Sequence, residues 1–135
     1  MAYIIKNKFP IDLEERKAIG FSLPLDGPAV FKPTYTTKEQ LKSNLINYFL
    51  TNKGERYLNF HFGANLRDMV FEGIVEENIE TLKMRIETDL KRYFPTVNIK
   101  ELNVLGNEDQ NLVKIEITYN VVNFGIEDTI DLIVQ

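Results

Sequence analysis

The sequence predicts an α+β domain in which three helices pack on a small antiparallel β-sheet with a C-terminal strand meander. Residues 36–94 carry apolar residues at helical spacing, whereas residues 97–134 alternate apolar and polar residues. An antiparallel meander packed on the helices is the simplest arrangement of these elements. At 135 residues the chain fits a single domain, which we place at residues 18–135 after an N-terminal arm over residues 1–17.

The first 34 residues show little periodicity. Residues 3–5 form either a short strand or a docking segment, and residues 12–17 are a charged patch. We therefore expect an arm that neighbouring elements order. Three prolines punctuate residues 23–34 around a turn signal at Asp26-Gly27, which predicts one or two short strands joined by a tight turn.

Two helices are expected next. The first begins at Thr36 or Thr37, because Glu or Gln follows each threonine three residues later, as in a capping box. It stops near Asn52, and its apolar stripe consists of Leu41, Leu45, Ile46, Tyr48 and Phe49. The second covers residues 65–71, with Asn65 as its N-cap.

The third helix is expected over residues 76–94. Its acidic start and basic end both complement the helix dipole, and Pro95 prevents its continuation. Strands are expected over residues 97–104, 112–119 and 126–134, with a slip in the alternation near Lys100-Glu101. Turns are expected at residues 106–109 and 123–125.

The segment between the first two helices is the first candidate for function. Gly54 follows the helix where a residue that tolerates positive φ is usually needed. The planar guanidinium of Arg56 suits bidentate pairing with carboxylates, including those of another chain. The alternative is a surface pair of Glu55 and Arg56 that contributes about 0–1 kcal/mol.

An aromatic run follows this charge pair. Tyr57, Phe60 and Phe62 either plug the core under the helices or contact a partner, and both interpretations can hold for different members of the run.

The last strand is the second candidate. Ile130, Leu132 and Val134 share one face, and the strand can lie at a sheet edge with unpaired N–H and C=O groups. Such an edge can accept a strand from a neighbouring protein. Three carboxylates on the same strand can instead guard the edge: Glu127, Asp128 and Asp131.

Composition narrows the functional classes. The chain has no cysteine and one histidine, which excludes disulfides, thiolate metal sites and imidazole clusters. No carboxylate spacing matches a calcium loop, so we expect no metal and no other cofactor. A net charge of −4 argues against nucleic acid as the main ligand. We find no signal peptide and no apolar run of about 18 residues, so no membrane partner is expected.

Catalysis is not expected. Glycoside hydrolysis needs two carboxyl groups about 5–9.5 Å apart across a cleft, and Glu55, Asp68 and Glu72 are the candidates. Asp68 and Glu72 share a helix face, but both suit ordinary solvated positions, and the chain has no tryptophan for sugar stacking. His61 has no nucleophile-elbow serine to serve.

Residues 18–94 carry ordered motifs that resemble the phage baseplate-wedge family of contractile tails, which has relatives in type VI secretion systems. The motifs are Leu50-Thr51-x-x-Gly54-Glu55-Arg56, then Phe62-Gly63-x-x-Leu66, then Val70-Phe71-Glu72. Upstream, residues 19–25 are similar to the short strand that precedes the first helix of the family. Some members have a proline between or beside the charged pair, whereas Glu55 and Arg56 are adjacent here.

The resemblance implies a structural role without enzymatic activity. The expected protein joins the inner baseplate to the first sheath ring and initiates sheath assembly, in a virion tail baseplate assembled in the host cytoplasm. Its expected partners are other baseplate wedge proteins and the tail sheath protein, in a hetero-oligomeric assembly. The expected contact residues are Gly54, Glu55, Arg56, Tyr57, Phe60, Phe62, Ile130, Leu132 and Val134. Two alternatives stay open: an adaptor-type regulatory module of the same fold family, and a peptidoglycan-cleaving muramidase.

Overall fold

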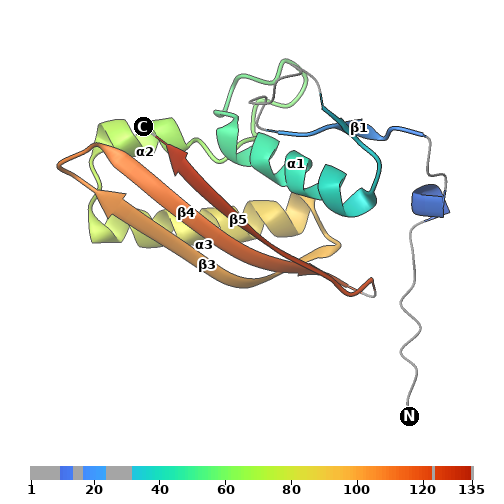
Figure 1. Cartoon of the computed structure of the whole chain (residues 1–135). Helices are drawn as coiled ribbons and strands as arrows, with labels where there is room; N and C mark the ends of the chain where they lie inside the picture. Colours follow the sequence, from blue (N-terminus) through green and yellow to red (C-terminus); the bar gives the residue numbers. More distant parts are fainter. Residues whose placement is uncertain (1–9, 14–16, 24–31, 123, 135) are drawn as a thin grey trace, which may run out of the picture.

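The computed structural model describes residues 10–13, 17–23, 32–122 and 124–134, and Figure 1 shows the arrangement of the elements. In chain order these are η1 (Pro10–Leu13), β1 (Gly20–Phe21), β2 (Pro33–Thr34), α1 (Thr37–Leu50), α2 (Leu66–Glu72), α3 (Glu76–Tyr93), β3 (Val97–Asn107), β4 (Leu112–Val121) and β5 (Ile126–Val134). The predicted α+β class, with three helices and a C-terminal meander, is confirmed.

The main sheet is antiparallel in the order β3-β4-β5, so β4 is central and β3 and β5 are its edges. The buried face of β4 carries Val113, Ile115, Ile117 and Tyr119, each at most 1% exposed, as their alternation predicted. The register of β3 shifts between Ile99 and Glu101, which confirms the predicted slip near Lys100. This shift is a β-bulge, in which one strand carries an extra residue.

The turn after β3 starts later than predicted. Gly106 and Asn107 still pair with Val113 and Leu112, so the expected turn at residues 106–109 is wrong in its first half. A Cβ atom on Gly106 would lie 1.8 Å from Cγ2 of Ile74. Because glycine has no side chain, Ile74 can pack closely against the backbone of β3 at this position.

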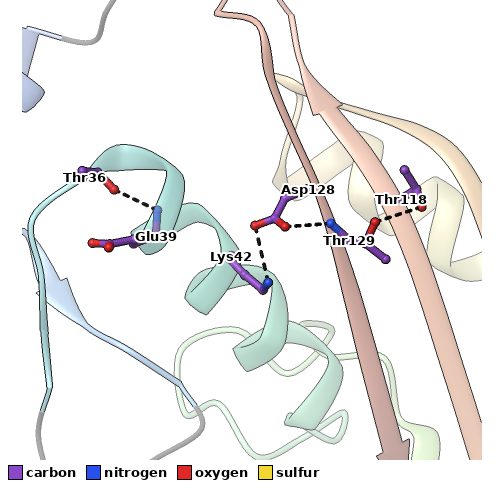
Figure 2. Close-up of polar contacts among 6 residues, drawn as sticks. All are labelled: Thr36, Glu39, Lys42, Thr118, Asp128 and Thr129. Carbon is purple, nitrogen blue, oxygen red and sulfur yellow. Dashed lines mark hydrogen bonds and ion pairs between the residues drawn. The ribbon is translucent and has the colours of Figure 1, made fainter.

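Helix α1 begins as its capping sequence predicts. The Thr36 hydroxyl accepts a hydrogen bond from the Glu39 N–H at 3.3 Å, which Figure 2 shows at the start of the helix. The Glu39 carboxylate accepts from the N–H of Tyr35 at 3.2 Å, one residue before the expected partner. The helix ends at Leu50, two residues earlier than predicted, where the N–H of Thr51 still donates to the Asn47 carbonyl at 3.1 Å.

The N-terminal residues reach this same helix start. Asp12 in η1 accepts hydrogen bonds from the Thr37 N–H at 2.8 Å and from the Thr37 hydroxyl at 2.6 Å. Strands β1 and β2 form one short antiparallel pair beside α1, consistent with the expected short strands. Residues 3–5 and the Asp26-Gly27 turn lie outside the described residues. The division into an arm and a domain stays a prediction.

The core lies between the helices and the inner face of the sheet. In α1 it includes Leu45, Tyr48 and Phe49, and in α3 it includes Leu82, Ile86 and Leu90, matching the predicted stripes. Along the sheet, α3 packs on β3, α1 on β5 and α2 on β4. Among the described residues, no helix is both long enough and apolar enough to span a membrane.

Helix α2 begins within one residue of its predicted start, but not by the predicted cap. Asn65 has a left-handed backbone with φ of 58°, and its side chain makes no hydrogen bond to the helix backbone. Instead its amide Nδ2 donates to the Asp68 carboxylate at 2.5 Å. An N-cap has an extended backbone and accepts from the N–H groups of the first turn, so Asn65 pairs with Asp68 without capping the helix.

Candidate functional site

The segment from residue 51 to residue 65, here called the α1–α2 loop, folds back onto the end of α1. The Ala64 N–H donates to the Tyr48 carbonyl at 3.1 Å, and the Gly54 N–H donates to the Phe60 carbonyl at 2.8 Å. Gly63 has φ of 123°, and a Cβ atom there would lie 2.4 Å from the Thr51 carbonyl oxygen. The close approach of these two backbones therefore requires glycine.

Gly54 also has positive φ, 89°, but it does not end the helix as we predicted. The helix is capped by Thr51 in an extended conformation. The positive φ of Gly54 serves the turn that follows, where the Glu55 N–H donates to the Asn52 carbonyl at 3.2 Å. The pattern predicted the conformation of the glycine correctly and its place in the fold incorrectly.

Phe62 fixes the loop to the core. Its ring is 5% exposed and meets the rings of Tyr48 and Tyr93 edge-on, with centroids 5.5 Å and 5.1 Å apart. Edge-to-face pairs of this kind contribute about 0.5–1.5 kcal/mol beyond the area they bury. Core and partner contact were the two interpretations of the aromatic run, and Phe62 is a core residue.

Arg56 lies on the outer side of this anchored ring. Its guanidinium carbon is 4.0 Å from the centroid of the Phe62 ring, within the range of a cation–π contact. The side chain is exposed and forms no ion pair with any residue that the structure describes. The contact with the ring restricts the guanidinium, which stays exposed and able to pair with a carboxylate.

Glu55 has a different role from its neighbour. Its carboxylate accepts hydrogen bonds from the N–H and the side-chain amide of Asn52, at 2.9 Å and 3.0 Å. These bonds, with a smaller contribution from the charge of Arg67, hold the pKa of Glu55 below its usual value. Glu55 therefore closes the turn, while Arg56 faces outward.

Three further apolar side chains of the loop are exposed. Tyr57 is 85% exposed and Phe60 is 58% exposed. Leu58, which the sequence analysis did not single out, is 93% exposed between them. Exposed apolar clusters mark interaction surfaces more often than scattered single residues do. Leu58 lies within the aromatic run, and that position was the signal that could have identified it.

Strand β5 lies at the edge of the sheet, where the sequence analysis expected it. Ile130 and Val134 are 2% and 8% exposed, and Leu132 is partly buried against the core. These three side chains therefore hold the strand on the helices, and the backbone edge is the part available to a neighbour.

The first half of this edge is guarded. The Thr129 N–H donates to Asp128 Oδ1 at 2.9 Å, and Asp128 Oδ2 lies 3.4 Å from Lys42 Nζ of α1. Figure 2 shows Asp128 on the α1 side of β5, while the Thr129 hydroxyl faces Thr118 of β4 at 3.3 Å. The Thr129 N–H thus points away from β4, and the carboxylate covers it.

Alternate residues of an edge strand direct their N–H groups the same way. The N–H groups of Asp131 and Ile133 therefore also face away from β4. Asp131 is exposed, and it forms no hydrogen bond or ion pair with any side chain in the described ranges. Beyond Thr129, no side chain of the described residues accepts a hydrogen bond from these outward N–H groups.

A groove of about 260 Å³ joins the two candidate regions. At its α1 end lie Leu50, the last residue of α1, and Asn52 of the loop, and at its sheet end lie Ile133 and Val134. Leu66 and Arg67 of α2 complete it, with Phe49 at its base. The fold therefore brings the start of the loop and the end of β5 together, although Asn52 and Ile133 are 81 positions apart in sequence.

The candidate catalytic carboxylates lie elsewhere. Asp68 and Glu72 share a face, as predicted, and line a hollow of about 100 Å³ together with Arg85. Pockets that enclose small-molecule ligands are usually larger, about 300–1,000 Å³. Glu55 and His61 are exposed loop residues that do not line it. Within the described residues, no three His, Cys, Asp or Glu side chains form a metal-sized group.

Comparison with known proteins agrees with this architecture. The curated baseplate wedge protein gp25 of Enterobacteria phage T4 is 28% identical over 83 residues, which cover 62% of this chain and 63% of the phage protein. The aligned region is therefore less than two thirds of the length of that relative.

Two solved structures share the fold. A crystal structure from Geobacter sulfurreducens, described as a tail lysozyme, superposes with a TM-score of 0.63 at 18% identity, covering 75% of this chain and 92% of that one. A chain of the anti-feeding prophage baseplate gives a TM-score of 0.59 at 22% identity, covering 76% and 84%. At these identities the similarity shows the fold alone.

A family model supplies the remaining comparison. The model described as "Baseplate wedge protein gp25" matches residues 36–125, from the N-cap of α1 to the turn before β5. The matched region contains the three helices, β3, β4 and the α1–α2 loop. Because it covers more than half of the chain, this protein belongs to the baseplate wedge protein gp25 family of contractile tails.

Proposed function

We propose that this protein links the inner baseplate to the first sheath ring and initiates sheath assembly. Baseplate wedge proteins are parts of multi-subunit baseplates, so a wedge protein needs more than one contact surface. In our proposal the α1–α2 loop docks on neighbouring wedge proteins, and the edge of β5 pairs with a strand of the sheath protein. The assembly forms in the host cytoplasm and remains in the virion tail.

The position of Arg56 is the observation that carries the docking half of this proposal. A guanidinium stacked at 4.0 Å on a buried ring is oriented before a partner arrives, so less side-chain freedom is lost on binding. Beside it, Tyr57, Leu58 and Phe60 offer an apolar surface that a partner can cover. A carboxylate on the partner would complete a charge-assisted, bidentate contact.

The open edge of β5 supports the sheath half. A strand added to an exposed edge gains main-chain hydrogen bonds over its whole length without any change in the fold beneath it. Ile130, Leu132 and Val134 contribute by holding the edge strand rigidly on the core. Both contacts act through surface complementarity, and no bond is made or broken.

We infer that the protein is not an enzyme. What supports this inference is the small volume beside Asp68 and Glu72, and the engagement of Glu55 in closing its own turn. Purified protein is therefore expected to leave the turbidity of a peptidoglycan suspension unchanged. Clearing that Asp68→Asn abolishes would instead establish a muramidase.

Substitution of Arg56 tests the docking surface. Arg56→Ala is expected to leave the isolated protein folded, because an exposed cation–π contact is worth about 0.5–1 kcal/mol. Wedge assembly is expected to fail, because removing one partner from a buried ion pair costs about 3–5 kcal/mol. Assembly is measured by co-purification of the wedge proteins, and folding by urea unfolding.

Lys53→Ala is the matched control, since Lys53 is an exposed cation of the same loop whose side chain makes no ring contact and no ion pair within the described residues. It is expected to assemble normally. Normal wedge assembly by Arg56→Ala would remove the loop from the proposal.

A further inference from the structure

The end of β5 and the groove beside it form one continuous surface. Val134 lines the groove with its side chain, and the outward N–H of Ile133 lies directly before it on the open edge. A fourth strand would run about 4.8 Å beyond β5, and residues paired across strands point to the same face. A partner residue paired with Val134 would therefore direct its side chain toward the helices, into the groove.

The lining of the groove defines the side chain that it fits. Phe49, Leu50, Leu66 and Val134 present apolar surface, which favours a branched apolar residue. Arg67 is exposed on the rim and forms no ion pair with another described residue. Its charge favours a carboxylate next to that apolar residue.

The charge of β5 disfavours a second copy of this chain at the same edge. Strand β5 carries Glu127, Asp128 and Asp131 and no basic residue, so two β5 strands would bring acidic residues together with no opposite charge to offset them. Like charges directly opposite each other destabilise a sheet. The charges of the strand therefore favour a strand from a different protein.

We infer that the partner strand pairs with the second half of β5, residues 130–134, and not with its whole length. This inference rests on the proposed function. It inserts one branched apolar side chain into the groove, and a neighbouring acidic residue pairs with Arg67. The Asp128 carboxylate covers the Thr129 N–H and lies 3.4 Å from Lys42 Nζ, so the first half of the edge has one donor already engaged and favours pairing less than the second half. Pairing that is limited to residues 130–134 fixes the register of the added strand relative to β5.

Site-specific cross-linking in assembled tails tests this arrangement. The chain has no cysteine, so Leu50→Cys, Thr129→Cys and Ile133→Cys each introduce a single thiol for a benzophenone maleimide. Met84→Cys, exposed on α3, is the control. Labels at residues 50 and 133 are expected to cross-link to one segment of another tail protein, at least fivefold more than the labels at residues 129 and 84. Mass spectrometry is expected to show an apolar residue beside an acidic one in that segment.

The outcomes separate the inference from the function on which it rests. Strong cross-linking from residue 129 with none from residue 50 would leave strand pairing intact and overturn the groove and the register. Cross-links from residues 50 and 133 to a second copy of this chain would overturn the partner. Absence of partner cross-links from all three β5 and groove positions would contradict strand pairing itself, and with it the sheath half of the proposed function.

A charge reversal tests the role of Arg67. Arg67→Glu is expected to reduce the yield of sheathed tails about tenfold, and reversing the charge of the cross-linked acidic residue is expected to restore it. Lys91→Glu makes the same change at an exposed position of α3 away from the groove and is expected to have no effect. An unchanged yield with Arg67→Glu would overturn the acidic partner residue.

Discussion

Phe62 connects the core to the loop at the scale of single residues. Its ring makes edge-to-face contacts with the rings of Tyr48 and Tyr93. The guanidinium carbon of Arg56 lies over the same ring, 4.0 Å from its centroid. The sequence offered core and interface as competing interpretations for this residue. Because the side chain is buried, Phe62 is a core residue. Its contact with Arg56 gives it an indirect part in the proposed docking.

Phe62→Leu is expected to lower the free energy of unfolding by about 1–2 kcal/mol, through the lost ring contacts. It is also expected to impair wedge assembly although Arg56 is still present, because the guanidinium loses the surface that orients it. Phe94→Leu removes another ring that contacts Tyr48 and leaves the Arg56–Phe62 pair in place. Equal assembly defects in the two variants, measured by co-purification, would show that stability alone accounts for the effect.

Tyr48 is the centre of this aromatic cluster and carries a buried hydroxyl. The hydroxyl donates to Asp89 Oδ2 at 2.8 Å, linking α1 to α3. Tyr48→Phe is expected to destabilise the fold by about 1.5 kcal/mol, the worth of a hydrogen bond to a charged group. Urea unfolding checks this value, with Tyr35→Phe at an exposed site as the control that is expected to change little.

The same residue predicts how stability depends on pH. Burial, and then the hydrogen bond to Asp89, raise the pKa of Tyr48 above its usual value of 10. The unfolded chain therefore releases this proton first, so stability should fall as the pH rises above about 10. Burial raises the pKa of Tyr119 in the same direction. Unfolding curves between pH 8 and about pH 11 should show a shallower decline for Tyr48→Phe; an equal decline would contradict the assignment.

At the scale of elements, η1 and α1 are joined by one carboxylate. Asp12 accepts both the N–H and the hydroxyl of Thr37, which satisfies a free donor in the first turn of the helix and places a negative charge at its positive end. This bond joins two residues that lie 25 positions apart in the chain.

Asp12→Ala is expected to lower the free energy of unfolding by about 1 kcal/mol, as the loss of an N-cap does. It should also release η1, so the amide protons of residues 11–13 and of Thr37 should exchange faster with solvent. Asp109→Ala, in the exposed turn between β3 and β4, removes the same charge without touching a helix end. If both variants unfold at the same urea concentration, Asp12 does not cap α1.

At the scale of the whole molecule, the helices pack on one face of the sheet (Figure 1), the loop carries exposed apolar residues, and β5 is an edge strand. The groove lies between these regions, so partners on the loop and on the strand would meet at one end of the protein. This arrangement suits a subunit that joins two layers of an assembly.

Particles made without this protein are therefore expected to show tail tubes without attached sheath in electron micrographs. The reason is that the first sheath ring would lack the strand edge on which we propose that it starts. Supplying the wild-type protein should restore sheathed tails, whereas Arg56→Ala should not. Fully sheathed tails in the absence of the protein would contradict the initiating role.

Local patterns determined most of the elements, because helix caps, apolar periodicity and alternation act over a few residues. The three helices, the three long strands and the bulge at Lys100 were all predicted from such patterns. The errors fall where distant residues decide. Gly106 stays in β3 because Ile74 packs on it, and α1 ends early because residues 51–65 fold back onto its last turn.

The sequence by itself therefore determined the class of fold, the family motifs and the segments with functional potential. Only the tertiary structure decided that Phe62 is buried while Tyr57, Leu58 and Phe60 are exposed, because burial depends on the rings that α1 and α3 bring to one place. It alone placed the start of the loop and the end of β5 around one groove. Contacts between residues so far apart in the chain arise from packing of whole elements, and no local pattern encodes them.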